Sequence, residues 1–133
     1  MSPEARGSGR CPEDSVRSYL ASFAGGDPDA IAAHVDPAFV NEHASALGRG
    51  SSGADEYRSR LPGFLASLPG LRYDVESVIA AGERVAVQYR LTATSDGHPI
   101  DLRGVMVIDV RDGLIARRTD YWDSLTYLRQ TDH

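Results

Sequence analysis

Lysine is absent from this 133-residue sequence, in which all fourteen basic residues are arginines. Catalysis through a Schiff base and anchoring of pyridoxal phosphate both require a lysine amine, so neither chemistry is open to the chain. The glycine-rich phosphate loop and the dinucleotide-binding fingerprint are missing as well. We therefore expect no cofactor.

Cysteine is nearly absent. Cys11 is the only one, which excludes a disulfide within the chain and fits a reducing cytoplasm. No apolar stretch approaches the roughly 18 residues of a membrane span, and residues 1–10 lack the apolar core of a signal peptide. The net charge is −5, with acidic residues along the whole chain, which disfavours nucleic acid as a partner. We expect a cytoplasmic protein that binds neither membrane nor nucleic acid.

The chain divides into a short arm and one domain. Residues 1–11 are rich in glycine, serine, proline and arginine, a composition typical of a disordered arm. The remaining length, residues 12–133, suits a single domain.

The first half of the sequence predicts helices. We expect helices at residues 13–24, 28–35 and 52–68, an extended piece at 39–43 and a loop at 44–53. Asp27 should cap the second helix, with Pro28 at its first position and Asp36-Pro37 ending it. Pro62-Gly63 lies inside the third helix and should kink or split it.

The second half has the alternation of strands. We expect strands at residues 71–80, 84–94, 100–110 and 114–122. Asp96-Gly97 and Asp112-Gly113 are strong signals for two-residue hairpin turns. Together the two halves predict an α+β fold, in which three N-terminal helices precede a four-stranded antiparallel meander.

The two Asp-Gly turns allow the sheet to be registered. If neither hairpin contains a bulge, Val105 opposes Asp120 and Arg103 opposes Trp122. One face then carries a polar set, namely Gln88, Arg90, Arg103, Val105, Arg118, Asp120 and Trp122. The other face is mostly apolar and reads as ordinary packing, with Val87, Tyr89, Leu91, Leu102, Met106, Ile108, Thr119 and Tyr121. A single bulge would exchange the two sets locally. The polar face is either exposed to solvent or part of a pocket wall. Trp122 indicates the pocket wall, because a large aromatic side chain prefers partial burial.

The closing segment, residues 112–123 (Asp-Gly-Leu-Ile-Ala-Arg-Arg-Thr-Asp-Tyr-Trp-Asp), resembles the ends of SnoaL-like proteins in the nuclear-transport-factor-2-like superfamily. The helix that ends in a Gly-Asp turn, residues 15–27, resembles its opening. The resemblance implies a cone, with helices on the concave side of a curved sheet around a pocket for a small apolar molecule. It also implies a homodimer formed through the sheet. For Asp120 it implies an acid or base role, with a salt bridge to Arg103 or Arg118 as the alternative.

Three reactions of the superfamily can be compared with these residues. A SnoaL-like cyclase needs one carboxylate that moves a proton on an enolisable substrate, so Asp120 suffices, with His43 or Tyr19 polarising a carbonyl. For a ketosteroid isomerase, Tyr19 matches the tyrosine and Glu42 or His43 the base, but Met106 stands near the place of the sheet acid. Epoxide hydrolysis requires a second carboxylate, which residues 86–90 do not supply.

The sequence thus predicts an acid–base enzyme of cyclase or isomerase type, with a non-catalytic ligand-binding module and an epoxide hydrolase as alternatives. The expected catalytic residues are Asp120, His43 and Tyr19. The expected substrate contacts are Trp122, Arg103, Gln88, Arg90, Phe39, Tyr57 and Phe64. The histidines and acids have no convincing metal spacing, so we expect no bound metal.

Overall fold

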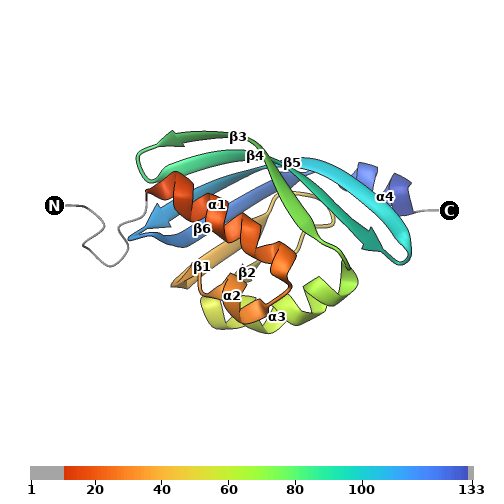
Figure 1. The fold of residues 1–133 in the computed structure, drawn as a ribbon, viewed down its shortest axis with the longest axis horizontal. Helices are drawn as coiled ribbons and strands as arrows, with labels where there is room; N and C mark the ends of the chain where they lie inside the picture. The colour runs from red at the N-terminus through yellow and green to blue at the C-terminus, as the bar shows by residue number, and fades with distance from the viewer. Residues whose placement is uncertain (1–10, 132–133) are drawn as a thin grey trace.

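The computed structural model describes residues 11–131 as a curved six-stranded sheet with four α-helices (Figure 1). The helices are α1 (Pro12–Ser22), α2 (Pro28–Ala32), α3 (Ala54–Ser67) and α4 (Ser124–Thr131), and a 3₁₀ turn at Phe23–Gly25 extends α1. The strands are β1 (Val35–His43), β2 (Ser51–Ser52), β3 (Arg72–Ala81), β4 (Arg84–Ser95), β5 (His98–Arg111) and β6 (Leu114–Trp122). The predicted α+β class is confirmed. The predicted arm lies outside the described residues, apart from Cys11.

The helices do not all precede the sheet, which corrects the predicted order. Helix α1 crosses one face of the sheet, and α2 and α3 lie together beside it (Figure 1). Two strands, β1 and β2, come before α3 in the chain. Helix α4 follows β6 and packs against β5, at the opposite end of the molecule from the start of α1 (Figure 1).

The sheet is mixed, with strand order β2-β1-β6-β5-β4-β3. The predicted meander forms β3 to β6, but the predicted extended piece 39–43 is the end of a longer strand, β1. That strand pairs in parallel with β6, so that His43 lies opposite Asp120. Parallel pairing joins segments that are far apart in sequence, and no local turn signal announces it.

The predicted helix boundaries were partly right. Asp27 caps α2, since its Oδ1 accepts a hydrogen bond from the backbone N–H of Asp29 at 3.0 Å. The helix ends at Ala32, however, because Val35 already belongs to β1 and is buried there. Of the predicted kink or split in α3, the split was wrong, because one helix continues through Pro62.

Both Asp-Gly pairs form the predicted two-residue turns. Asp96 and Asp112 have positive φ angles of 50° and 51°, and the glycines that follow them have 80° and 79°. Two successive positive φ angles define the type I′ turn that matches the twist of a hairpin. The predicted register of β4 and β5 is confirmed as well, with Arg90 opposite Arg103.

One extra residue in β6 overturns the predicted register of the last hairpin. The pairing holds as far as Ile115, but Ala116 is then skipped in the ladder with β5. Ile115 and Ala116 are both buried, as expected where a bulge interrupts the alternation of faces. Beyond the bulge each residue of β6 is displaced by one position. Met106, and not Val105, therefore opposes Asp120.

The bulge splits the predicted polar face. Arg118 and Asp120 turn to the face that carries Tyr89 and Met106, and all four are buried. The polar residues of β4 and β5 stay on the other, exposed face; these are Gln88, Arg90 and Arg103. A buried bulge thus brings a carboxylate and a guanidinium into the core.

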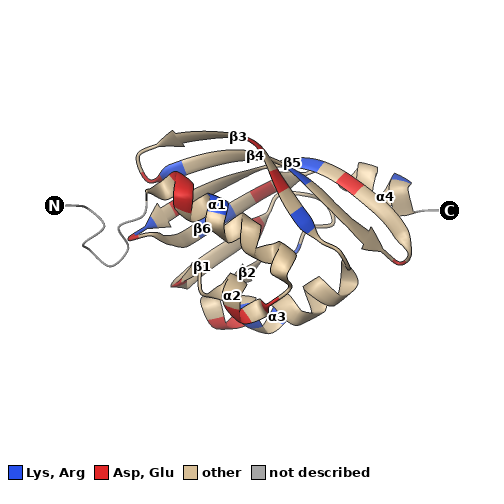
Figure 2. Cartoon of the chain, viewed as in Figure 1, with Lys and Arg blue, Asp and Glu red and all other residues tan. Residues whose placement is uncertain are grey.

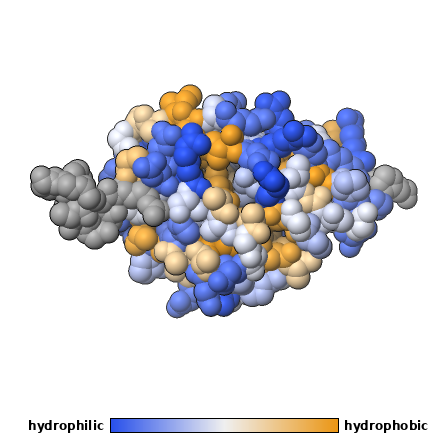
Figure 3. Space-filling model, viewed as in Figure 1, coloured by the Kyte–Doolittle hydropathy of each residue, from blue (hydrophilic) through white to orange (hydrophobic). Residues whose placement is uncertain are grey.

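Charges elsewhere are distributed over the outside of the molecule. Basic and acidic residues alternate along the strands and helices in Figure 2, and the face in Figure 3 is a mosaic of polar and apolar residues. Within residues 11–131, no helix is both long and apolar enough to span a lipid bilayer.

Replacement of Gly63 by alanine should stabilise the protein. Gly63 lies inside α3, and a Cβ atom added there would meet no atom within 4 Å. We predict that Gly63→Ala raises the free energy of unfolding by about 0.5–1 kcal/mol, the usual difference in helix propensity. Urea denaturation measures this change. Gly70→Ala is the matched control, because the site is equally open but has a φ of 74° and should lose stability. Equal effects of both substitutions would contradict the prediction.

Candidate functional site

A buried ion pair lies at the centre of the site. The Nη2 of Arg118 donates to Oδ2 of Asp120 at 2.8 Å, and the two residues are 3% and 2% exposed. They stand two positions apart on β6, beyond the bulge, and so share its buried face. The hydroxyl of Tyr89 donates to the other carboxylate oxygen at 2.5 Å. The negative charge of Asp120 is therefore compensated inside the protein.

Three more tyrosines surround Arg118. Its Nη1 donates to the hydroxyl of Tyr19 at 2.8 Å, and its Nη2 also lies 3.4 Å from the hydroxyl of Tyr73. The hydroxyls of Tyr19 and Tyr57 are hydrogen-bonded at 2.5 Å. Burial raises the pKa of Tyr73 to about 12 and that of Tyr57 well above its usual value. These two phenols are therefore neutral near pH 7 and can donate protons in hydrogen bonds.

His43 lies beside the carboxylate as a neutral ring. Its Nδ1 is 3.9 Å from Oδ2 of Asp120, too long for a hydrogen bond, but it accepts one from the indole Nε1–H of Trp122 at 3.2 Å. Burial, helped by the charge of Arg118, lowers the pKa of His43 to about 4. Because Nδ1 is an acceptor, the proton of the neutral ring sits on Nε2.

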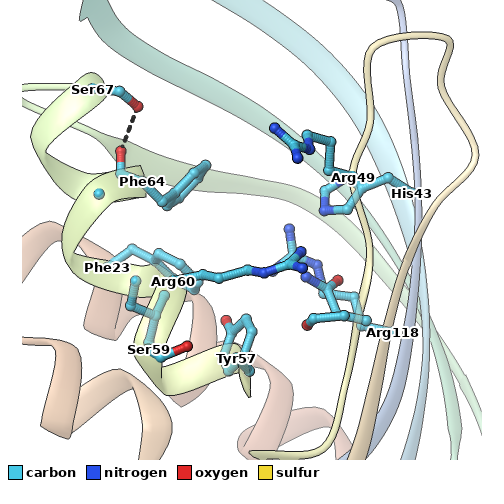
Figure 4. A pocket seen from close by; sticks show the side chains of 13 residues that line it. Phe23, His43, Arg49, Tyr57, Ser59, Arg60, Phe64, Ser67 and Arg118 are labelled. Carbon is cyan, nitrogen blue, oxygen red and sulfur yellow. Dashed lines mark hydrogen bonds between the residues drawn. The ribbon is translucent and has the colours of Figure 1, made fainter. Parts of the chain in front are cut away.

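Two neighbouring cavities meet at His43. The first, called here the apolar cavity, has a volume of about 230 Å³, and its wall includes Leu68, Leu91, Ile100, Leu102, Asp120 and Trp122. The second, the arginine cavity, has a volume of about 610 Å³, and its wall includes Asn41, Arg49, Ser51, Tyr57, Arg60 and Arg118. His43 and Phe64 line both. In Figure 4, Arg60 reaches from α3 towards Arg118, and His43, Arg49 and Arg118 all lie across the cavity from α3.

Carboxylates are scarce in these walls. Asp120 is the only one among the described residues that line either cavity. Within residues 11–131, no three histidine, cysteine, aspartate or glutamate side chains gather as a metal site would require.

The structure brings five of the predicted site residues to the cavities: Asp120, His43, Trp122, Tyr57 and Phe64. Two others lie one layer deeper. Tyr19 is fully buried and contacts the site through Arg118 and Tyr57. Phe39 is fully buried too, with its ring centroid 4.8 Å from that of Tyr57.

The other three predicted contacts lie away from Asp120, and their predicted grouping with it was wrong. Gln88 is hydrogen-bonded to Ser77 on the exposed face of the sheet. Arg90 is paired with Asp101, and Arg103 with Glu76 at 2.9 Å. The register shift at the bulge is the physical reason, because it moved the end of β6 to the opposite face.

Between Glu42 and His43, the structure places His43 at the site. Glu42 is exposed and accepts a hydrogen bond from Arg117 at 2.6 Å. The alternation of side chains along β1 directs the two residues to opposite faces of the sheet.

Tyr89 was missed by the sequence reasoning, which assigned it to ordinary packing. One signal could have found it. Gly104 lies inside β5, directly opposite Tyr89, and glycine in a strand marks a close approach. A Cβ atom on Gly104 would lie 2.5 Å from the hydroxyl oxygen of Tyr89 and 2.7 Å from the carbonyl oxygen of Tyr121. The absence of a side chain there gives the phenol its path to Asp120.

Gly104→Ala should therefore disrupt the site. The new methyl group must displace Tyr89, which breaks the hydrogen bond to Asp120, and it also meets the backbone of β6. We predict a loss of about 1–3 kcal/mol in the free energy of unfolding, the usual cost of overpacking. Urea denaturation measures the loss, with Gly63→Ala as the control. Unchanged stability of Gly104→Ala would contradict the described position of Tyr89.

The depressed pKa of His43 predicts a pH dependence of stability. The unfolded chain binds a proton at His43 below about pH 6.5, whereas the folded protein binds it only near pH 4. The contribution of neutral His43 to the free energy of unfolding is complete above pH 6.5 and is lost as the pH falls towards 4. Between pH 7.5 and 5.0 we expect His43 to account for a loss of about 2 kcal/mol.

Unfolding of the natural protein and of His43→Asn at both pH values measures this contribution. The variant should lack that part of the loss, while the other titrating groups affect both proteins alike. A wild-type His43 ring that titrates near pH 6.5 by NMR would contradict the prediction.

Comparisons with known proteins agree with this architecture. A hypothetical protein from Catenulispora acidiphila with a ketosteroid isomerase-like fold, solved in complex with trimethylamine, has a TM-score of 0.81 and 17% identity, over 89% of this chain and 92% of that one. A putative SnoaL-like polyketide cyclase from Jannaschia sp. has a TM-score of 0.74 and 21% identity, and the alignment covers 90% of each chain. An LEH-like epoxide hydrolase from M. tuberculosis has a TM-score of 0.75 and 19% identity, and the alignment covers 87% of this chain and 88% of that one. At these identities the likeness establishes the fold alone.

No curated protein matches the sequence significantly. The profile of the SnoaL-like domain matches residues 16–118, which is most of the chain and includes α2, α3, the strands β1 to β5 and the bulge in β6. The match ends at Arg118, so Asp120 and Trp122 at the end of β6 lie outside it. The chain belongs to the family of SnoaL-like domains.

Proposed function

We propose that the protein is an acid–base enzyme of cyclase or isomerase type, which acts on an apolar, enolisable substrate with Asp120 as the proton-transfer residue. The observation that carries the proposal is the position of Asp120. It is the single carboxylate of the described cavity walls, and aliphatic side chains and Trp122 surround it in the apolar cavity. A base at an apolar wall can reach a C–H bond while water is kept away.

The first step uses Asp120 in the apolar cavity and His43 at the junction of the two cavities. Asp120 takes a proton from the carbon next to a substrate carbonyl, and the electron pair of the broken C–H bond moves to the carbonyl oxygen as an enolate. His43 is neutral, and its Nε2–H donates a hydrogen bond to that oxygen. Arg118 holds Asp120 in place from behind and keeps its charge balanced.

The second step decides between the two reaction types. In an isomerase, the protonated Asp120 returns its proton to a different carbon of the same conjugated system. In a cyclase, the enolate carbon attacks a second carbonyl of the substrate, a C–C bond closes the ring, and the resulting alkoxide takes the proton from Asp120. Tyr57 and Phe64 contribute to the walls that shape this choice.

A non-catalytic ligand-binding module is the second candidate. Both oxygens of Asp120 already accept hydrogen bonds, from Tyr89 and from Arg118, as they would in a purely structural ion pair. No observation favours epoxide hydrolysis, because the described cavity walls hold no second carboxylate. A homodimer formed through the exposed sheet face and a cytoplasmic location stay predictions.

Asp120→Asn should abolish proton transfer. The assay is the exchange of α-protons for deuterium in apolar cyclic ketones, beginning with 2-tetralone, followed by NMR in D₂O. We expect the natural protein to accelerate exchange and the variant to lose a factor of about 10²–10⁴, the usual contribution of a general base. Asp101→Asn removes an exposed carboxylate and should leave exchange unchanged.

Asp120→Asn leaves Arg118 as an unpaired buried charge and can unfold for that reason. The double variant Arg118→Met/Asp120→Asn removes both charges, so it should fold and still be inactive. Exchange at the natural rate in a folded Asp120 variant would exclude the assigned role. Binding of ketones by the natural protein without any exchange would favour the ligand-binding module instead.

A further inference from the structure

The arginine cavity has a positive charge that no described residue balances. Three guanidinium groups line it, and no carboxylate does so among the described residues. Arg118 is paired with Asp120, and the Nη2 of Arg60 is paired with Glu56 at 3.1 Å. Arg49 has neither a hydrogen bond nor an ion pair with any described residue. In a chain of net charge −5, a guanidinium at a cavity wall that has no partner within residues 11–131 stands out as a binding group for an anion.

The loop that carries Arg49 is fixed in place from two sides. At one end, Ser45 is hydrogen-bonded to the backbone of Trp122, and the N–H of Leu47 donates to Ser124 at 3.1 Å. At the other end, Arg60 donates to the carbonyl oxygen of Gly50 at 2.6 Å. The guanidinium of Arg49 therefore projects from an ordered segment, which reduces the entropy lost when it binds a ligand.

Unmet hydrogen bonds gather at the same cavity. The described residues contain four buried side-chain polar atoms without a partner. Three of these belong to residues that line the arginine cavity: Oδ1 of Asn41, Oγ of Ser51 and Nε of Arg118. Buried polar groups are nearly always paired, and two of these three, Oγ of Ser51 and Nε of Arg118, are donors of the kind that an anionic ligand group satisfies.

A carboxylate fits these features better than a phosphate. One guanidinium presents two parallel N–H groups that match the two oxygens of a carboxylate and its single charge. A phosphate near pH 7 carries close to two charges, whereas among the described residues Arg49 is the one cation of this cavity without a partner. The two cavities meet at His43, so one elongated molecule can extend its apolar part into the apolar cavity and its charged end towards Arg49.

We propose that the ligand of this site is an apolar molecule with a carboxylate group, which Arg49 binds in the arginine cavity. The binding of a carboxylate is independent of the reaction, but the naming of a substrate rests on the proposed function. On that function, the substrate class is an apolar keto acid. The enolisable carbon then lies at Asp120 and the acid group lies on the far side of His43.

The test is an equilibrium binding measurement with two matched probes, 3-phenylpropanoate and 3-phenylpropanamide. Trp122, the single tryptophan of the chain, lines the apolar cavity, and its fluorescence reports binding. We expect the natural protein to bind the carboxylate at least about tenfold more tightly than the amide, as a charge-assisted bidentate contact implies. Added salt should weaken binding of the carboxylate alone.

Variants assign the preference to Arg49. Arg49→Gln should bring the two affinities within about threefold, whereas Arg49→Lys keeps the charge and should keep much of the preference. Arg84→Gln is the matched control, because this arginine is exposed on β4 and borders neither cavity. Its preference should be that of the natural protein.

Three results would overturn the proposal: equal affinity of the natural protein for both probes, an unchanged preference in Arg49→Gln, or binding of neither probe at millimolar concentration. The measurement requires no turnover. Loss of the carboxylate preference thus refutes the role of Arg49, whereas exchange that survives in Asp120 variants refutes the proposed reaction.

Discussion

The burial of Arg118 and Asp120 is the constraint on which the rest of the site depends. Two charges removed from water destabilise a protein unless each has a charge partner and hydrogen bonds. Here the partners come from four elements, with Tyr19 on α1, Tyr57 on α3, Tyr73 on β3 and Tyr89 on β4. The packing of the helices on the sheet therefore positions the polar groups. The same contacts that satisfy the ion pair shape the cavities beside it.

The bulge at Ala116 explains how a strand with ordinary alternation delivers this pair to the core. Without the extra residue, Arg118 and Asp120 would lie among Gln88, Arg90 and Arg103 on the exposed face. There, ion pairs such as that between Arg103 and Glu76 are screened by water and contribute little. Behind the bulge, the same residue types are shielded from solvent, and their mutual orientation is fixed. A local change of one residue thus separates a surface ion pair from a candidate active site.

The parts of the fold that depend on short-range interactions could be predicted from the sequence. Asp96-Gly97 and Asp112-Gly113 specified two hairpins, and Asp27 with Pro28 specified the start of α2. The bulge had no residue signal, because alanine is common on both faces of a strand. The parallel pairing of β1 with β6 was equally hidden, since it depends on packing over 77 residues between His43 and Asp120. Arg49 lies in a loop without periodicity, so only its place in space makes it notable.

The last strand of the chain is a central strand of the sheet. Strand β6 lies between β1, which precedes α3, and β5, which directly precedes β6 in the chain. Until β6 is in place, β1 and β2 have no edge to join, and the concave side has no continuous wall. The sheet is thus completed only when β6, the last of its strands in chain order, has been synthesised. Folding of this protein is then governed by contacts distant in sequence, which are slow to form, and the candidate site is complete only with β6.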